Sequence, residues 1–377
     1  MRNLTGYIEE NMDEFLDLLK TLVNMDSPTT EKSATDIFCN YLNNYFNNLG
    51  VYSEIINQVI YGNHLKVVYG DAKEQILVLC HMDTVWPIGE SIRRPFKIVG
   101  EKAYGPGVFD MKTGIAQSMF AIKYFKENNR RFSKKIVFLY NSDEEVGSPS
   151  SRAIIEKEAL NSQQVLVLEP AEPPGNLKTA RKGVGMFEIQ VTGRASHAGA
   201  AHEQGVSAIK ELAHQVLKLE SITDYALGTT VNVGVISGGT RRNVVPAEAN
   251  ALVDLRAINL EEAVKVEKEI LSLKPFLKGT NISVSGGINR PPMVKTEKIT
   301  ELFLKAKNIA RELGFDIEDD LSGGGSDGNF TSNLNIPTLD GLGGVGDGAH
   351  SESEYIELKE IPKRTALFVQ LLEMLSN

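Results

Sequence analysis

The hydrophobic residues of this chain follow two patterns, helical spacing and short continuous runs. Apolar side chains recur every three or four positions over residues 4–23 and again over 37–49, which predicts two amphipathic helices. Further along, apolar runs alternate with helical segments such as 112–128. The strands that these runs predict lie near 51–59, 65–69, 76–80, 136–140 and 165–168. This alternation predicts an α/β fold with a mixed, mostly parallel sheet flanked by helices.

The pattern changes after Pro173-Pro174-Gly175. Strands and helices are then predicted in the order β-α-β-β-α-β, at 183–193, 204–219, 229–236, 248–257, 260–273 and 280–285. This order is that of a small ferredoxin-like α+β domain, one sheet covered by two helices. Since α/β character returns afterwards, we predict a discontinuous domain over 1–178 and 290–377 with an inserted domain over 179–289.

Size and charge exclude several classes of protein. A chain of 377 residues exceeds one ordinary hydrophobic core, and a net charge of -9 without a basic block argues against a nucleic-acid partner. No apolar run approaches the length of a membrane span, and the acidic N-terminal segment does not resemble a signal peptide. The two cysteines, Cys39 and Cys80, are too few for a disulfide framework or a cysteine zinc site. We expect a cytoplasmic protein without a membrane partner.

Polar side chains follow the ends of the predicted strands. They are His81 with Asp83, Asp110 in a tight turn, the pair Glu144–Glu145, Glu169, and His350 in a late glycine-rich loop. The carboxyl ends of parallel strands open onto one crevice, and carboxylates crowded there repel unless cations neutralise them. Imidazole and carboxylate ligands without thiolates suit zinc, or a similar divalent ion, in a catalytic site.

The adjacent pair Glu144–Glu145 suggests a division of labour. Neighbouring side chains of an extended segment diverge, so both are not expected to bind one metal ion. One glutamate of the pair would then be a ligand, and the other would act as a general base on the metal-bound water.

These motifs together resemble a known superfamily, the dizinc metallopeptidases and amidohydrolases that include aminoacylase, acetylornithine deacetylase, succinyl-diaminopimelate desuccinylase and carboxypeptidase G. The resemblance is strongest to the glutamate carboxypeptidase branch and runs from about residue 10 to the C-terminus. The motifs are, in order, His81-x-Asp83, Gly105-Pro-Gly-x-x-Asp110-Met-Lys-x-Gly114, Asp143-Glu144-Glu145-x-Gly147-Ser148, Glu169-Pro170, Gly193-Arg-Ala-Ser-His197-Ala-Gly199, Arg242-Asn243-Val-Val-Pro246 and Gly323-Gly-Gly-Ser-Asp327. The fold that this resemblance implies is of the zinc-exopeptidase type, with the inserted domain serving as a lid and dimerisation domain.

The resemblance also implies two Zn²⁺ ions per subunit, for which Co²⁺ or Mn²⁺ could substitute. Asp110 would bridge the two ions. His81 and Glu169 would complete one site, and Glu145 and His350 the other.

Catalytic and substrate-binding roles are implied for further residues. Asp83 would orient His81, and Glu144 would be the general base. His197 of the lid would stabilise the oxyanion, reaching into the partner subunit's site across a homodimer. The terminal carboxylate of the substrate would be held by Asn243, Arg256, Gly323, Gly324 and Gly325.

The predicted activity is zinc-dependent hydrolysis of an amide or peptide bond that releases a C-terminal amino acid. A metal-activated water would attack the carbonyl with Glu144 as base, and a glutamate carboxypeptidase is the first choice. The alternatives within the superfamily are a dipeptidase, an aminoacylase or an N-acyl-amino-acid deacylase. The substrate would be a small peptide or an N-acyl amino acid.

Two more distant alternatives remain. Gly324-Gly-Ser326-Asp-Gly328 matches the G-x-S-x-G pattern of serine hydrolases, with Asp340 and His350 following in order, but an acidic segment precedes it instead of a buried strand. A peptide-binding protein without catalysis would be expected to have lost ligands, and all five predicted ligands and the base are present.

Overall fold

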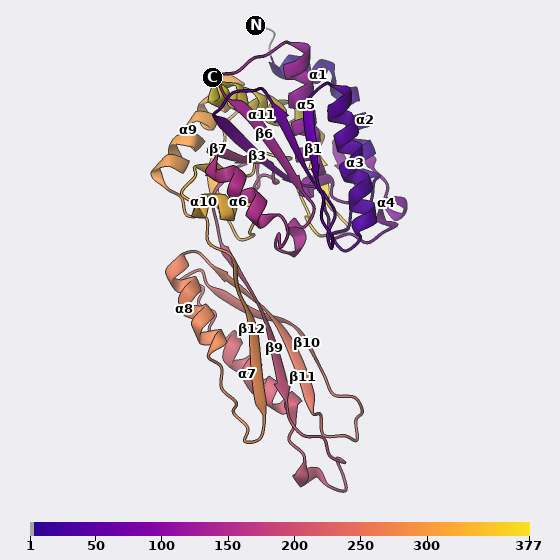
Figure 1. Cartoon of the computed structure of the whole chain (residues 1–377), viewed down its shortest axis with the longest axis vertical. Helices are drawn as coiled ribbons and strands as arrows, with labels where there is room; N and C mark the ends of the chain where they lie inside the picture. The colour runs from indigo at the N-terminus through magenta and orange to yellow at the C-terminus, as the bar shows by residue number, and fades with distance from the viewer. Residues whose placement is uncertain (1–3) are drawn as a thin grey trace. The chain divides into compact units, whose positions relative to one another are not determined.

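The chain folds into two compact units in a computed structural model that describes residues 4–377 (Figure 1). The first unit comprises the residues up to Ala180 together with Lys295–Ser322 and Ser326–Asn377. The second comprises Arg181–Val294 and the short segment Gly323–Gly325. The chain thus passes between the units at 180/181 and 294/295, where the sequence pattern placed the boundaries at 178/179 and 289/290.

A six-stranded mixed sheet forms the centre of the first unit. Its strands, in spatial order, are β1 (Tyr52–Ile56), β2 (His64–Tyr69), β6 (Lys135–Asn141), β3 (Gln75–His81), β7 (Ser162–Val167) and β14 (Thr338–Leu339). The four strands from β6 to β14 are parallel, whereas β1 and β2 form an antiparallel edge. The predicted mixed, mostly parallel sheet is confirmed.

Helices cover both faces of this sheet because β3 is apolar on both sides. Ile76, Val78 and Cys80 pack into one core with helices on that face, and the alternate residues Leu77 and Leu79 pack into the other. The first core involves α1 (Leu4–Glu10), α2 (Met12–Val23), α3 (Lys32–Asn48), α5 (Thr113–Glu127), α9 (Glu297–Glu312) and α11 (Ile361–Ser376). The second involves α6 (Arg152–Leu160) and α10 (Gly328–Asn333). Residues 4–23, expected as one helix, form two, which meet at Asn11.

Smaller elements complete the first unit. A four-stranded antiparallel sheet has the order β15 (Gly346–Asp347), β16 (Tyr355–Glu357), β5 (Lys102–Tyr104) and β4 (Lys97–Val99). β13 (Asp319–Ser322) pairs with β8 (Leu177–Arg181), and α4 spans Glu90–Arg93. Short helical turns lie at Glu144–Val146 and Leu358–Glu360, and Val108–Lys112 forms a turn whose backbone is not helical at Asp110 and Met111. No helix within residues 4–377 is both long enough and apolar enough to cross a lipid bilayer.

The second unit has one antiparallel sheet with two helices on one face (Figure 1). The strand order is β10 (Thr230–Gly238), β11 (Glu248–Ala257), β9 (Gly183–Thr192) and β12 (Asn281–Arg290). The helices are α7 (Ala208–Glu220) and α8 (Leu260–Leu271), and a short helical turn lies at His202–Gln204. Inward residues such as Phe187 and Ile189 of β9 form its core with Leu212 of α7 and Val266 of α8. The predicted β-α-β-β-α-β order is confirmed.

Glycines bring two backbones close to the end of β7. A Cβ atom added to Gly114, at the start of α5, would overlap the carbonyl oxygen of Leu168. A Cβ atom added to Gly343 would overlap the same oxygen and approach the backbone of Glu169. The residue that follows Leu168 is one of the predicted ligands, so these close contacts fix the backbone from which its side chain projects.

Candidate metal centre

The first unit gathers the five predicted ligands into two groups that share one residue. His81 ends β3, Glu169 follows β7, and the donor atoms of both lie within 4.8 Å of Asp110 and of each other. Glu145, in the turn after β6, and His350 form the second group with Asp110 under the same limit. The fold of the first unit therefore brings together five residues that are far apart in the sequence, as the pattern of polar residues at strand ends predicts.

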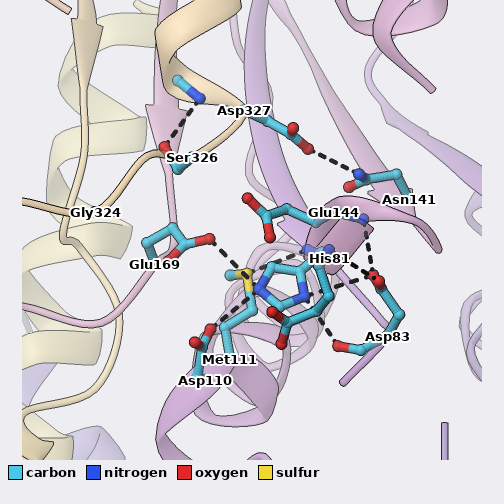
Figure 2. A network of polar contacts seen from close by, with 12 residues as sticks. His81, Asp83, Asp110, Met111, Asn141, Glu144, Glu169, Gly324, Ser326 and Asp327 are labelled. Atoms are coloured by element: carbon cyan, nitrogen blue, oxygen red, sulfur yellow. Dashed lines mark hydrogen bonds and ion pairs between the residues drawn. The ribbon is translucent and has the colours of Figure 1, made fainter. Parts of the chain in front are cut away.

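Asp110 faces a different histidine with each of its oxygens. Its Oδ1 lies 3.1 Å from His81 Nε2, and its Oδ2 lies 3.3 Å from His350 Nε2. The other carboxylates complete each group, with Glu169 Oε1 3.4 Å from His81 Nε2 and Glu145 Oε2 3.1 Å from His350 Nε2. Figure 2 shows the His81 ring with Asp110, Glu169 and Asp83 around it. A carboxylate with one oxygen in each of two ligand groups has the geometry of a bridging ligand.

The donor atoms of this centre fit divalent cations. Three carboxylates converge in a largely buried space, and Glu145 Oε1 is buried without a hydrogen-bond partner among residues 4–377. Burial, with the nearby Asp110 charge, raises the pKa of Glu145 to about 7. Imidazole nitrogens and carboxylate oxygens without thiolates are the donor set of catalytic zinc sites. A cation would both satisfy the orphaned oxygen and relieve the repulsion between the carboxylates.

Protons and cations compete for the two histidines. Burial opposes the charging of His81, but its hydrogen bonds to Asp110, Asp83 and Glu169 outweigh burial and raise its pKa well above the usual range. Hydrogen bonds to Asp110 and Glu145 raise the pKa of His350 to about 11. Each ring must lose a proton to ligate a metal ion, so binding of metal releases protons and weakens as the pH falls.

Asp83 uses its backbone and its side chain for different purposes. Its carbonyl oxygen lies 3.0 Å from His81 Nδ1, closer than its carboxylate at 3.6 Å, so a backbone group is the nearer contact of the ring. Its carboxylate accepts hydrogen bonds from the backbone N–H groups of Glu144 (3.2 Å) and Glu145 (3.1 Å). The hydroxyl of Thr29 donates a third, at 2.7 Å. Asp83 therefore fixes both the ring and the turn that carries the two glutamates.

The two adjacent glutamates occupy different positions in the centre. The side chain of Glu145 belongs to the second ligand group, whereas that of Glu144 belongs to neither. Both stand on the helical turn Glu144–Val146 whose first N–H groups Asp83 holds. This separation is the arrangement expected of one ligand and one general base.

Glu354 was not assigned a role from the sequence, yet it supports the ligands directly. Its carboxylate, 1% exposed, accepts hydrogen bonds from the backbone N–H groups of Gly107 (2.9 Å), Phe109 (2.8 Å) and Asp110 (2.9 Å). Trp86 Nε1 donates another, at 3.2 Å. His350 lies four residues earlier with a left-handed backbone, φ 61°, which is uncommon without glycine. Glu354 thus ties the loop of one ligand to the loop of another, a contact that only the folded chain brings about.

Ser326 is not arranged as a nucleophile. It is fully buried, its hydroxyl donates to Asp340 Oδ2 at 2.6 Å, and it accepts from the N–H of Gly328. His350, which a serine triad would require beside it, faces Asp110 and Glu145 instead. The geometry removes the serine-hydrolase alternative.

The remaining predicted residues lie in the second unit. His197 Nδ1 accepts hydrogen bonds from the N–H groups of Gly199 (3.1 Å) and Ala200 (2.9 Å), so in a neutral ring the proton is on Nε2. The carbonyl of Asn243 accepts from the N–H of Ala198, which places the two segments side by side. Arg256 forms a two-pronged ion pair with Asp254, at 2.8 and 2.9 Å.

The glycine segment 323–325 is held within the same unit. Arg181, 2% exposed, directs Nη1 to the carbonyl oxygens of Gly324 (3.1 Å) and Gly325 (3.4 Å). A Cβ atom added to Gly323 would meet no atom of residues 4–377 within 4 Å, apart from its chain neighbours.

A sheet that collects two overlapping sets of imidazole and carboxylate ligands at its carboxyl edge is what a hydrolytic metallopeptidase requires. The chain belongs to peptidase family M20/M25/M40, whose family model matches residues 77–374. A metal cofactor is in keeping with this family and with the ligand groups.

Named relatives and solved structures agree with this assignment. The chain is 32% identical to carboxypeptidase G2 of Pseudomonas sp. (strain RS-16), over 94% of this chain and 87% of the relative. It is 25% identical to succinyl-diaminopimelate desuccinylase of Rickettsia rickettsii (strain Sheila Smith), over 95% of this chain and 99% of the relative. The crystal structure of aminopeptidase PepT from Bacillus cereus ATCC 10987 is similar with a TM-score of 0.73 at 25% identity, covering 97% of this chain and 99% of that one.

Glu354→Gln is expected to weaken metal binding while leaving the fold intact. The substituted amide would place an NH₂ group against backbone N–H donors, so the Asp110 loop would lose part of its support. We expect the affinity for Zn²⁺ to fall by about 10- to 100-fold, the usual effect of losing a partner behind a ligand. Calorimetric titration of the metal-free protein measures this directly.

Glu352→Gln is the matched control for that substitution. Glu352 lies two residues away, is 66% exposed and pairs with Arg93 at the surface. Its affinity for Zn²⁺ should equal that of the wild type. Equal affinity for the Glu354→Gln protein would show that Glu354 does not support the centre.

Proposed function

We propose that the protein is a zinc-dependent carboxypeptidase that releases a C-terminal amino acid, with glutamate as the first choice. The observation that carries this proposal is Asp110 shared between two ligand groups, with Glu144 beside the ligand Glu145 but outside both groups. The 32% identity to carboxypeptidase G2 over nearly the whole chain supports a carboxypeptidase, an enzyme that cleaves the last peptide bond and releases the C-terminal amino acid.

The proposed cofactor is a pair of Zn²⁺ ions. His81, Glu169 and Asp110 would hold one ion, and Asp110, Glu145 and His350 the other. When bound, the pair would lower the pKa of a water molecule and polarise the scissile carbonyl. Co²⁺ or Mn²⁺ would be accepted by the same nitrogen and oxygen donors.

Glu144 is proposed to carry the proton through the reaction. Its carboxylate would take a proton from the attacking water and return it to the nitrogen of the departing amine. The hydrogen bond that the N–H of Glu144 donates to Asp83 fixes the turn on which this base stands. A base that keeps one position can serve both transfers without rearrangement of the loop.

His197 is proposed to stabilise the oxyanion that forms on the substrate. Because its Nδ1 accepts two backbone hydrogen bonds, a neutral ring presents Nε2–H as a donor. We propose that the enzyme is a homodimer and that His197 serves the site of the partner subunit.

Arg256 is proposed to bind the terminal carboxylate of the substrate together with Asn243 and Gly323–Gly325. The pair with Asp254 uses Nε and Nη2 and so holds the guanidinium in a fixed plane. Its Nη1 group would then donate to the carboxylate of the substrate.

A second candidate is hydrolysis of a dipeptide or of an N-acyl amino acid. The similarity to a desuccinylase and to PepT over nearly the full chain favours this candidate. These activities share the same chemistry and differ in the groups on the two sides of the scissile amide.

A hydrolysis panel separates these candidates. The Zn²⁺-loaded enzyme is incubated with N-benzoyl-glutamate, N-benzoyl-alanine, N-succinyl and N-acetyl amino acids, and unblocked dipeptides, and released amines are quantified. We expect the highest kcat/KM for N-aroyl-glutamate, and loss of all activity after chelation. A preference for unblocked dipeptides or for aliphatic N-acyl groups would instead establish the second candidate.

Glu144→Gln is expected to abolish turnover without loss of metal. The amide cannot accept the proton of water, and Glu144 is in neither ligand group. We expect kcat to fall by about 10²- to 10⁴-fold, the range of a general base, with two metal ions per chain by elemental analysis. Glu145→Gln, one residue away, should instead lose metal. Normal turnover of the Glu144→Gln protein would remove Glu144 from the mechanism.

Mixing two inactive variants tests whether His197 acts across the dimer. We expect the His197→Ala and Glu144→Gln proteins each to be nearly inactive. If His197 serves the partner, subunit exchange should restore activity, because a mixed dimer contains one site with both residues intact. Activity that stays at the level of the separate variants, with exchange verified by mass spectrometry, would place His197 and Glu144 in the same chain's site.

A further inference from the structure

The loop that carries Glu144 and Glu145 is anchored at both ends by one buried histidine. His64 opens β2 and is fully buried. Its Nδ1 lies 3.1 Å from the hydroxyl of Ser142, at the start of the loop after β6. Its Nε2 lies 3.1 Å from the hydroxyl of Ser150, where the loop returns toward α6. A single ring therefore connects the two ends of the catalytic loop to a neighbouring strand.

The hydrogen of the Ser150 hydroxyl is already used. It donates to Asp143 Oδ2 at 2.7 Å, and the N–H of Ser150 donates to the same oxygen at 2.6 Å. The hydroxyl of Ser151 donates to Asp143 Oδ1 at 2.5 Å. Because a serine hydroxyl has one hydrogen, the contact between Ser150 and His64 requires a proton on Nε2. His64 therefore donates to Ser150, and Ser150 donates to Asp143, the residue before Glu144.

The other nitrogen of the ring has a partner that can adapt. The Ser142 hydroxyl lies within hydrogen-bond distance of both the Gly62 carbonyl and Nδ1 of the ring. It can donate to Nδ1 when that nitrogen is bare, or to Gly62 when Nδ1 is protonated. Burial lowers the pKa of His64, and nearby Lys32 adds to this, while the charges of Asp143 and Asp83 oppose it. A neutral ring with its proton on Nε2 keeps both contacts to the loop.

We propose that His64 is a positioning residue for the catalytic loop, acting through the hydrogen bond from Nε2 to Ser150 and on to Asp143. The inference rests on the proposed function of Glu144 as base. His64 belongs to neither ligand group, so it acts on turnover only by holding the loop. Asp83 holds the N–H groups of Glu144 and Glu145 from one side, and His64 holds the ends of the same loop from another.

Replacing His64 by glutamine or by asparagine tests the contact of Nε2 with Ser150 separately from the contact of Nδ1 with Ser142. In His64→Gln the amide nitrogen can reach the place of Nε2 and donate to Ser150. In His64→Asn the shorter amide reaches only the place of Nδ1. We expect the glutamine variant to keep kcat within a few-fold of the wild type. For the asparagine and alanine variants we expect a fall of about 10- to 100-fold, the effect of a small displacement of catalytic groups, with KM little changed.

Each variant is compared at saturating Zn²⁺, with metal content and thermal unfolding measured in parallel. His214→Asn is the control, because His214 is exposed on α7 and outside the proposed site. Its kcat should equal that of the wild type. A glutamine variant as slow as the alanine variant, or an alanine variant as fast as the wild type, would overturn the proposal.

A spectroscopic readout keeps this test separate from the test of the proposed function. In ¹⁵N-histidine-labelled, metal-free protein near pH 7, the resonance that disappears in His64→Gln should have the signature of a ring protonated on Nε2. In uniformly ¹⁵N-labelled protein, hydrogen exchange of the backbone amides of Glu144 and Glu145 should be slow in the wild type and in His64→Gln. The same amides should exchange faster in the alanine variant. The opposite tautomer, or unchanged exchange, would refute the role of His64 even if the protein cleaves none of the substrates tried.

Discussion

Electrostatic repulsion among carboxylates is the constraint on which this structure depends. Asp110, Glu145 and Glu169 converge at the carboxyl edge of one sheet with side chains that are 15%, 7% and 10% exposed, so water screens their charges only weakly. Hydrogen bonds to these carboxylates raise the pKa values of His81 and His350, so without cations the two rings take up protons. The two oxygens of Asp110 face one histidine each, so the negative charge is shared between the two candidate ligand groups. The rest of the first unit holds these like-charged groups in place.

Other carboxylates near the site do not belong to the ligand groups and instead accept hydrogen bonds from backbone N–H groups. Asp83 binds the turn of Glu144 and Glu145, and Glu354 binds the loop of Asp110. Asp143 closes the loop of Glu144 and Glu145 on itself, because the N–H and hydroxyl groups of Ser150 donate to its carboxylate. Each of these carboxylates gains hydrogen bonds that offset the cost of burying its charge. The candidate ligands Asp110 and Glu145 are therefore held through their main chain.

Much of this architecture could be predicted from the sequence. The apolar run before His81 is buried on both faces, as the absence of alternation predicted, and polar residues at strand ends do meet because parallel strands end at one edge. The second unit was predictable from the order in which its strands and helices follow one another. The break at Asn11 was missed, because apolar spacing continues across it and only the local backbone interrupts the helix.

The supporting residues could not be predicted in the same way. Glu354 and His64 contact segments that are far away in the sequence. Glu354 accepts from the N–H of Asp110, 244 residues away, and His64 contacts Ser150, 86 residues away. Their partners are backbone groups and serine hydroxyls, which carry no pattern of their own in a sequence. Periodicity describes how a strand or helix faces its core. It does not describe which loops meet once the strands are in order.

The position of His350 in the chain has a consequence for how the centre is assembled. Four ligands, from His81 to Glu169, precede the inserted unit, whereas His350 follows it. During synthesis Asp110 and Glu145 would therefore be present before His350, the imidazole of their group, and before α11 covers the sheet. Newly made chains would acquire a complete pair of ion sites only after the inserted unit has been synthesised.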